Sequence, residues 1–280
     1  MHGRSLTGLI ALALVCALAA SPAAAQTDPG KLPDWNGQWR RIGAGNQWDP
    51  TKPAGLAQQA PLTPEYQAIF EANLADQAAG GQGTDPLYRC VPPGMPRQMT
   101  VVFPMEIMIM PSTTYMAFEQ GNVLRRIYTD GRGFPAEREP SFAGYSIGKW
   151  LDQGGTGRYD LLEIEIRGFK GPRVYDPAGI PLHQDNESIV KERLFLDKQN
   201  PDLMHDEITT IDHALTRPWT VTKTVRRERN PMWYENNCME DNHHVEIGAQ
   251  SYFLGADGML MPAKKDQLPP DLRYFQQGKK

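Results

Sequence analysis

Short runs of alternating apolar and polar residues dominate the chain from about residue 100 to residue 228. These runs are rich in β-branched and aromatic side chains, and turn residues separate them at near-regular intervals. In the run YDLLEIEIRGF, Leu162, Ile164 and Ile166 alternate with charged residues, so one face is buried and the other is solvated. The pattern predicts a mainly β protein, an antiparallel meander of roughly eight to ten strands that closes into a barrel or packs as a sandwich.

Residues 62–80, LTPEYQAIFEANLADQAAG, carry the clearest helical pattern of the chain. Thr63 can cap the first turn, Pro64 suits the first helical position, and a pair of glycines follows the last turn. The sequence therefore predicts one N-terminal helix over about residues 63–79. Its apolar residues at helical spacing are Tyr66, Ile69, Phe70 and Leu74.

The first 25 residues have the pattern of a cleavable signal peptide, with a short charged start, an apolar run and three alanines before Gln26. The apolar run is too short to cross a bilayer. We therefore expect export, most simply to a bacterial periplasm. Cys16 offers an alternative as a lipoprotein anchor, but the bulky residues before it are not typical of such sites.

Changes in composition along the chain suggest four parts. A segment rich in Pro and Gly surrounds the predicted helix, and a loop-like stretch follows the last strands. The expected parts are a signal peptide at 1–25, an N-terminal segment at 26–84, a β-barrel domain at 85–254 and a C-terminal tail at 255–280.

The charge balance narrows the range of partners. The formal net charge is −4, and the acidity is spread along the chain. This argues against nucleic acid and against anionic lipid surfaces as partners. No segment after the signal peptide offers about 18 uninterrupted apolar residues, so we expect no transmembrane segment.

Two cysteines, Cys90 and Cys238, remain once the signal peptide is removed. In an oxidising compartment an even pair is typical of a disulfide, which would tie the front of the domain to its back. The alternative is two unpaired buried thiols.

Several spaced motifs resemble a family of exported bacterial proteins for which no reaction is established. The resemblance covers most of the chain from about Asp85 to Cys238 and implies export and a lipocalin-like (calycin-like) β-barrel. The stretch WLDQGGTGRYD departs from the family, whose members often carry a Trp-Glu-Gly-Asp turn there. The motifs are YRCVPPGMPRQM, MEIMIM, RRIYTDGR, GYSIGKW, ESIVKERL, RPWTVTK and ENNC.

The stretch LHQDNES raises the possibility of a metal site. His183, Asp185 and Glu187 alternate, so on a strand they would share one face. Zinc sites more often show closely paired His or Cys with a distant third ligand, and His205 and His213 were placed in or near a separate hairpin. We therefore expect no metal and no other cofactor.

Carboxylates on apolar faces are the candidates for acid–base chemistry. In MEIMIM, TTYMAFEQ, SIVKERLFL and MHDEITTI, the acids Glu106, Glu119, Glu192 and Asp206 share a face with apolar residues and are predicted to point into the barrel. A carboxylate in an apolar cavity must be paired or have its pKa raised, and a raised pKa suits proton transfer. The alternative is a network of ion pairs with Arg125, Arg126 or Arg193 that only fills the barrel.

His183 follows an ordered loop and could act as acid or base near neutral pH. Charged and aromatic residues at predicted loops and strand ends could grip a ligand. The predicted ligand-binding residues are Arg97, Arg126, Tyr128, Asp130, Arg132, Arg193 and Trp219.

These observations favour a periplasmic β-barrel with an internal pocket for a small hydrophobic or aromatic molecule. The leading hypothesis is a cofactor-free lyase, isomerase or hydrolase in which His183 and one of the inward glutamates move protons. The first alternative is a non-catalytic binding or carrier protein of the bacterial envelope. A third is an envelope interaction module.

Overall fold

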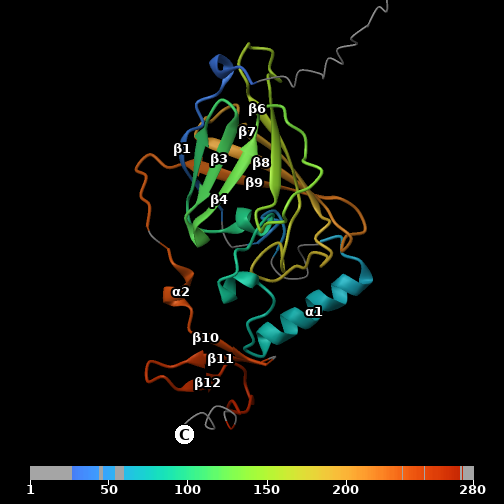
Figure 1. Cartoon of the computed structure of the whole chain (residues 1–280), viewed down its shortest axis with the longest axis vertical. Coiled ribbons are helices and arrows are strands. Elements are labelled where there is room, and N and C mark those ends of the chain that lie inside the picture. The colour runs from blue at the N-terminus through green and yellow to red at the C-terminus, as the bar shows by residue number, and fades with distance from the viewer. Residues whose placement is uncertain are drawn as a thin grey trace, which may run out of the picture.

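The computed structural model describes residues 27–43, 47–53, 60–234, 236–248, 250–271 and 273. The predicted signal peptide lies outside this part of the chain. Nine strands of the described residues form a closed barrel in sequence order, and three further strands form a separate small sheet (Figure 1). The mainly β class and the closed barrel are thereby confirmed.

The barrel strands follow one another along the chain. They are β1 (Gly37–Arg41), β2 (Met105–Ile109), β3 (Thr113–Phe118), β4 (Val123–Tyr128), β5 (Tyr145–Leu151), β6 (Leu161–Arg167), β7 (Ile189–Leu196), β8 (Leu203–Ile211) and β9 (Trp219–Arg227). β1 pairs with β9 and so closes the barrel. β1 comes from the Pro/Gly-rich segment before residue 85, and β9, the last barrel strand, ends at Arg227.

The expectation of an antiparallel meander is wrong at one place. β4 and β5 run parallel, with Ile127 opposite Ser146 and Tyr128 opposite Ile147. Parallel neighbours require a connection that returns along the length of the strand, and residues 129–144 supply it. Nine strands with one parallel pair also differ from the eight-stranded up-and-down barrel of lipocalins.

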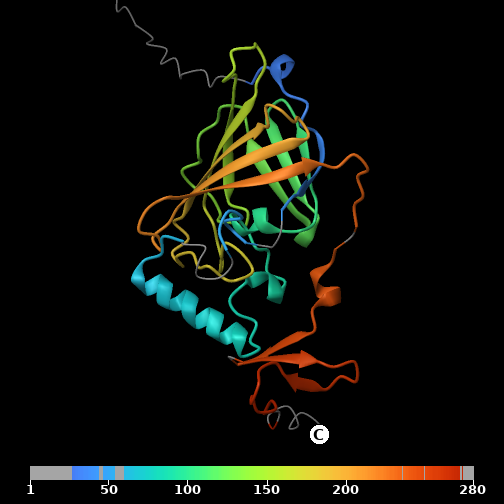
Figure 2. The same ribbon diagram turned by 180° about the vertical axis from the view of Figure 1, so that it is seen from behind.

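The helix α1 (Pro64–Ala78) forms where the sequence predicts it. The Thr63 hydroxyl accepts a hydrogen bond from the Tyr66 amide at 3.4 Å and caps the first turn. Tyr66 and Phe70 are buried, whereas Ile69 is 43% exposed and is not part of the packed face. α1 crosses one end of the barrel in both views (Figures 1 and 2).

Two backbone hydrogen bonds tie the chain around the start of α1 to the turn between β8 and β9. The Thr63 amide donates to the Ala214 carbonyl at 2.9 Å, and the Thr216 amide donates to the Pro61 carbonyl at 2.8 Å. Farther along α1, the Asn73 side chain donates to the Ala178 carbonyl at 2.5 Å. The helix is therefore fixed against the loops that close this end of the barrel.

Buried side chains from the inward faces of the strands fill the barrel. Trp39, Ile107, Met116 and Ile166 are each at most 1% exposed and belong to one continuous core. The methionines in and beside β2 and β3 divide between the two faces of the barrel wall. Met105 and Met116 point inward, whereas Met108 and Met110 lie on the outer face and are exposed.

The small sheet follows the barrel in sequence and lies beyond α1 in Figure 1. It comprises β10 (His244–Ile247), β11 (Gln250–Leu254) and β12 (Leu260–Pro262), and the short helix α2 (Cys238–Asp241) precedes it. The predicted disulfide is confirmed: Cys90 is bonded to Cys238 across 148 residues of sequence. None of the helices in the described ranges is long and apolar enough to cross a membrane.

Candidate functional site

A row of charged side chains crosses the interior of the barrel. Arg125 of β4, Glu192 of β7, Asp206 of β8 and Lys223 of β9 are each at most 3% exposed. Asp206 lies directly opposite Lys223 in the register of β8 and β9. Leu194 of β7 lies opposite Asp206 on the other side, and Glu192 is the next inward-facing residue of β7. Along each strand, the residues two positions before and two positions after the charged residue are apolar and face inward. The alternation of the strand therefore directs each charged side chain inward as well.

Most N–H groups of the Arg125 guanidinium have acceptors inside the barrel. It donates to Glu192 Oε1 at 3.0 Å and also to Oε2, and its Nε donates to the Ser146 hydroxyl at 3.2 Å. The Met95 and Met116 sulfurs approach the same guanidinium at 3.9 and 3.7 Å. Both oxygens of Glu192 are therefore occupied by a fully buried, bidentate ion pair.

Asp206 differs from Glu192 because no hydrogen bond of ordinary geometry reaches either of its oxygens in the described part of the chain. Burial, and then the nearby charge of Glu192, raise the pKa of Asp206 well above its usual value. Burial and the charge of Glu192 therefore both favour the protonated form of Asp206.

Lys223 is a buried amine with a strongly shifted pKa. Its Nζ donates to the Gln47 carbonyl at 2.9 Å and to the Trp48 carbonyl, and it lies 4.4 Å from the centre of the Trp48 ring. Burial lowers the pKa of Lys223 from 10.5 to about 7. Protonated and neutral forms therefore coexist at neutral pH.

Aromatic side chains close the interior near Lys223. The Trp219 ring centre lies 5.0 Å from that of Tyr175 and 6.2 Å from that of Trp48. Trp219, predicted to bind ligand, is only 5% exposed and lies in the core. Burial raises the pKa of the Tyr175 hydroxyl well above its usual value. Trp48, Tyr175 and Trp219 therefore fill this part of the barrel interior, where the sequence predicts an internal pocket.

A cleft of about 710 Å³ lies against the outer wall of β5–β9. Most of its lining residues on these strands lie between the inward-facing positions and so point outward. Examples are Lys149, Glu163, Lys191 and Thr220. Glu192 also borders the cleft, yet its side chain has no exposed surface. The cleft therefore lies outside the barrel wall, on the opposite side from the interior row.

A ladder of ion pairs covers the floor of this cleft. Arg193 lies 2.9 Å from Glu207 and 3.6 Å from Glu163, and Lys191 lies 3.7 Å from Glu165. Trp150 and Tyr159 stand at one end with ring centres 6.3 Å apart. The cleft thus combines hydrogen-bonding groups of balanced charge with an aromatic end.

Three of the predicted ligand-binding residues gather at the rim of the cleft. Arg132 lines it and forms a bidentate pair with Asp130, at 2.9 Å from Nε and 2.6 Å from Nη2. The guanidinium also lies 4.1 Å from the centre of the Tyr128 ring. The Asp130 carboxylate, and then Tyr145, raise the pKa of Arg132, so it stays cationic.

Other predicted residues lie elsewhere. Glu106 points outward from β2, whereas the sequence analysis predicted that it would point into the barrel. Arg126 is exposed on the outer face of β4. Glu119 is fully buried just after β3, and neither of its oxygens has a hydrogen-bond partner among the described residues. The inward direction of Glu192 agrees with the expectation, but its role in catalysis stays a prediction.

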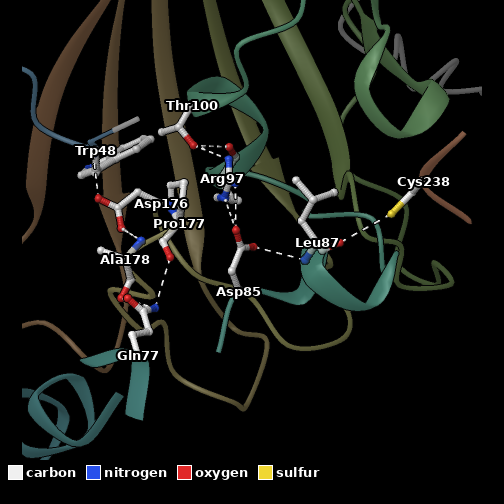
Figure 3. A network of polar contacts seen from close by, with 10 residues as sticks. All are labelled: Trp48, Gln77, Asp85, Leu87, Arg97, Thr100, Asp176, Pro177, Ala178 and Cys238. Atoms are coloured by element: carbon white, nitrogen blue, oxygen red, sulfur yellow. Dashed lines mark hydrogen bonds and ion pairs between the residues drawn. The ribbon is translucent and has the colours of Figure 1, made fainter. Parts of the chain in front are cut away.

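Arg97 belongs to a buried network at the end of the barrel near α1 (Figure 3). Its Nε and Nη2 donate to Asp85 Oδ2 at 3.2 and 2.8 Å, and its Nη1 donates to the Thr100 hydroxyl at 2.6 Å. A second cleft of about 390 Å³ borders Arg97 and Asp85, and Cys238 also lines it. The partners of Arg97 indicate that it mainly holds this loop together.

His183 lies beside α1, where its ring centre is 5.4 Å from that of Tyr66. Its nearest acidic partners are Asp185, 3.0 Å from Nδ1, and Asp212, whose Oδ1 accepts a hydrogen bond from the His183 amide at 2.8 Å. The glutamates predicted to act with it, Glu106, Glu119 and Glu192, are not among these contacts.

Two residues escaped the sequence prediction. Lys223 shares the parity of Trp219, Val221 and Val225 in WTVTKTV, so the alternation of that strand was enough to place it inward. His213 lies 2.5 Å from Asp185. Asp185 lies shortly before β7 and His213 shortly after β8, so antiparallel pairing of these two strands would have predicted the contact between Asp185 and His213.

A scan against protein-family models and a search of curated proteins both gave no match for this chain. The resemblance to exported bacterial proteins and the lipocalin-like assignment therefore stay predictions. The geometry of the residues themselves must support any functional conclusion.

Proposed function

We propose that this protein is an exported β-barrel that binds a small molecule in the cleft on the outer wall of β5–β9. The observation that carries the proposal is the cleft of about 710 Å³, with an aromatic end, a polar floor and Arg132 at its rim. Ligand sites commonly measure about 300–1,000 Å³ and combine apolar surface with a few placed polar groups.

The lining suits a ligand with an apolar or aromatic body and hydrogen-bonding substituents. Tyr159 and Ile147 offer apolar surface. The charged groups of the floor largely neutralise one another, so they present donors and acceptors without a strong net field. Arg132, raised in pKa and paired with one carboxylate, can still donate from its remaining N–H groups to a carbonyl or an anion.

Export supports the same picture. The predicted signal peptide would deliver the chain to the periplasm, where a disulfide such as Cys90–Cys238 persists. A binding or carrier role in the envelope is favoured over the acid–base enzyme, because Arg125 occupies both oxygens of Glu192. The likeness to lipocalins is limited to the closed barrel.

Cofactor-free acid–base chemistry remains a second candidate on one observation. Asp206 and Lys223 face each other in the interior with pKa values shifted in opposite senses, as expected of a proton donor and acceptor. Substrate would have to reach them past the aromatic residues that close the interior. The candidate reaction class is that of a lyase or isomerase.

The test is native mass spectrometry of protein purified from the periplasm without detergent, compared with its denatured mass. Thr220→Trp would fill the cleft, because Thr220 is exposed, points outward and lines it. Thr222→Trp is the matched control, since Thr222 is also exposed on β9 and does not line the cleft.

We expect wild type and T222W to carry the same additional mass, released on denaturation, and T220W to lack it. A wild-type protein that shows only the mass of its polypeptide would contradict binding. Retention of the ligand by T220W together with its loss from Lys223→Met would contradict the outer cleft and favour the interior pair.

A further inference from the structure

Three potential metal ligands converge outside the barrel, beside α1. One ring nitrogen each of His183 and His213 and one carboxylate oxygen of Asp185 all lie within 4.8 Å of one another. Asp185 Oδ2 is 3.0 Å from His183 Nδ1 and 2.5 Å from His213 Nδ1. Two imidazole nitrogens are thus directed at the same oxygen.

The hairpin of β7 and β8 brings these residues together. Ile189 at the start of β7 pairs with Ile211 at the end of β8, so the residues before one and after the other meet at the same end. His183 and Asp185 belong to the loop that leads into β7, and His213 belongs to the turn that follows β8. The antiparallel register is therefore what assembles the cluster.

A buried carboxylate holds the two segments in place. Asp212 Oδ1 accepts the amides of His183 and Ala214, each at 2.8 Å, and Oδ2 accepts the Ser188 hydroxyl. Asp212 is itself only 8% exposed. Such hydrogen bonds orient ligands before an ion arrives and are typical of the surroundings of metal sites.

Local contacts hold the imidazole of His183 beside the cluster. The Asp185 amide donates to His183 Nδ1 at 3.1 Å, and a metal ion bound at this nitrogen would replace that hydrogen bond. The Tyr66 ring, 5.4 Å from the imidazole between ring centres, covers another side of it. The His183 ring is therefore held in place next to Asp185.

We propose that His183, Asp185 and His213 bind a divalent transition-metal ion, with Zn²⁺ as the reference ion. Ligand bonds of about 2.0–2.1 Å in a tetrahedron place the donor atoms about 3.3 Å apart, which the three atoms reach with small side-chain rotations. Two imidazoles and one carboxylate suit zinc, nickel, cobalt or copper rather than calcium or magnesium.

Three protein ligands leave at least one position of the ion open to water or to another molecule. The ion would also join the loop before β7 to the turn after β8. His213 Nδ1 and Asp185 Oδ2 lie in direct contact, and the ion would take the place of that contact. The site does not depend on the cleft proposed above.

The test is isothermal titration of the mature protein, without a histidine tag, with zinc chloride. His213→Gln removes one ligand from a side chain that is 64% exposed, so the fold should survive. His205→Ala is the matched control, because His205 also pairs with an aspartate, Asp197 at 3.0 Å, without belonging to the cluster. Thermal unfolding with and without zinc is the second measurement.

We expect about one zinc ion per chain for wild type and H205A, and at least a tenfold loss of affinity for H213Q and for Asp185→Asn. Zinc should raise the midpoint of thermal unfolding of wild type and H205A but not of H213Q. Equal binding by H213Q and wild type, equal weakening by H205A, or an absence of saturable binding to wild type would each overturn the proposal.

Discussion

Lys223 places a titrating amine inside the barrel, and this has a consequence for stability. Its pKa is lowered by burial to about 7 in the folded protein, against 10.5 ordinarily. Below about pH 7 the amine is protonated in both states, and the cost of burying the cation is fully present. Between about pH 7 and 10 only the unfolded chain holds the proton, so the Lys223 contribution to the free energy of unfolding rises with pH.

Lys223→Met should therefore stabilise the protein most near pH 6–7, and the advantage should shrink toward pH 10. The largest slope attributable to Lys223 is about 1.4 kcal/mol per pH unit. Urea denaturation of both proteins from pH 6 to 10 measures it. Lys149→Met, at an exposed position on β5, is the control and should run parallel to wild type. Parallel curves for K223M and wild type would show that Lys223 has an ordinary pKa.

The two acids of the interior row should differ in how much stability the same amide substitution costs. Burial and then Glu192 raise the pKa of Asp206 well above its usual value and so favour the neutral acid, which asparagine resembles, so Asp206→Asn should change stability by about 1 kcal/mol or less. Glu192→Gln leaves the buried Arg125 guanidinium without its counter-charge and should cost about 3–5 kcal/mol. Denaturant midpoints at pH 7 compare them, and equal losses would refute a protonated Asp206.

The parity of a strand can be taken from the sequence only where one face is clearly polar. Glu192 was placed correctly, because Lys191 and Arg193 mark the other face of β7. In MEIMIM both faces are apolar, and Glu106 was assigned to the wrong one together with Met108 and Met110. The outer wall at β2 tolerates exposed methionine, so hydrophobicity alone could not decide the direction of Glu106.

At the scale of elements, local signals predicted most of the structure. α1 was predicted at 63–79 and spans Pro64–Ala78, because its cap and its first-turn proline act locally. β1 was missed, since GQWRR is short and stands in a segment rich in Pro and Gly. The parallel pairing of β4 with β5 was also missed, because strand direction depends on the course of a distant connection and leaves no periodic signal.

The candidate site was less accessible to prediction than the fold. Residues within one turn, such as Asp130 and Arg132, could be grouped from their spacing. The cleft takes residues from five strands, and the His183 cluster takes residues from two loops that the β7–β8 register joins. Such groupings require the pairing of strands, which a pattern of single residues does not contain.

At the scale of the whole molecule, the disulfide joins the loop before β2 to the helix that precedes the small sheet. It closes a segment of 148 residues that includes eight of the nine barrel strands. Cross-linking so long a segment restricts the unfolded chain and contributes up to about 5 kcal/mol on the chain-entropy account.

Replacing both cysteines, Cys90→Ser with Cys238→Ser, should therefore lower the free energy of unfolding by several kcal/mol, up to about 5. Urea denaturation of the variant and of wild type, each with and without reductant, measures the effect. Reductant should lower the stability of wild type once it has opened the bond and leave the variant unchanged. Equal stability of the oxidised wild type and the variant would show that the bond does not stabilise the fold.

The junction of β4 and β5 gives the barrel an uneven wall. Only two residue pairs join these strands in register, whereas eight join β7 to β8. Side chains reinforce this junction: Arg125 bonds to Ser146 within the barrel, and Tyr128 stacks on Tyr145 outside it, with ring centres 5.0 Å apart. Closure of the barrel at this junction consequently relies on one side-chain contact inside the barrel and one outside it. Transient opening of the barrel would begin here, because few backbone hydrogen bonds join β4 to β5.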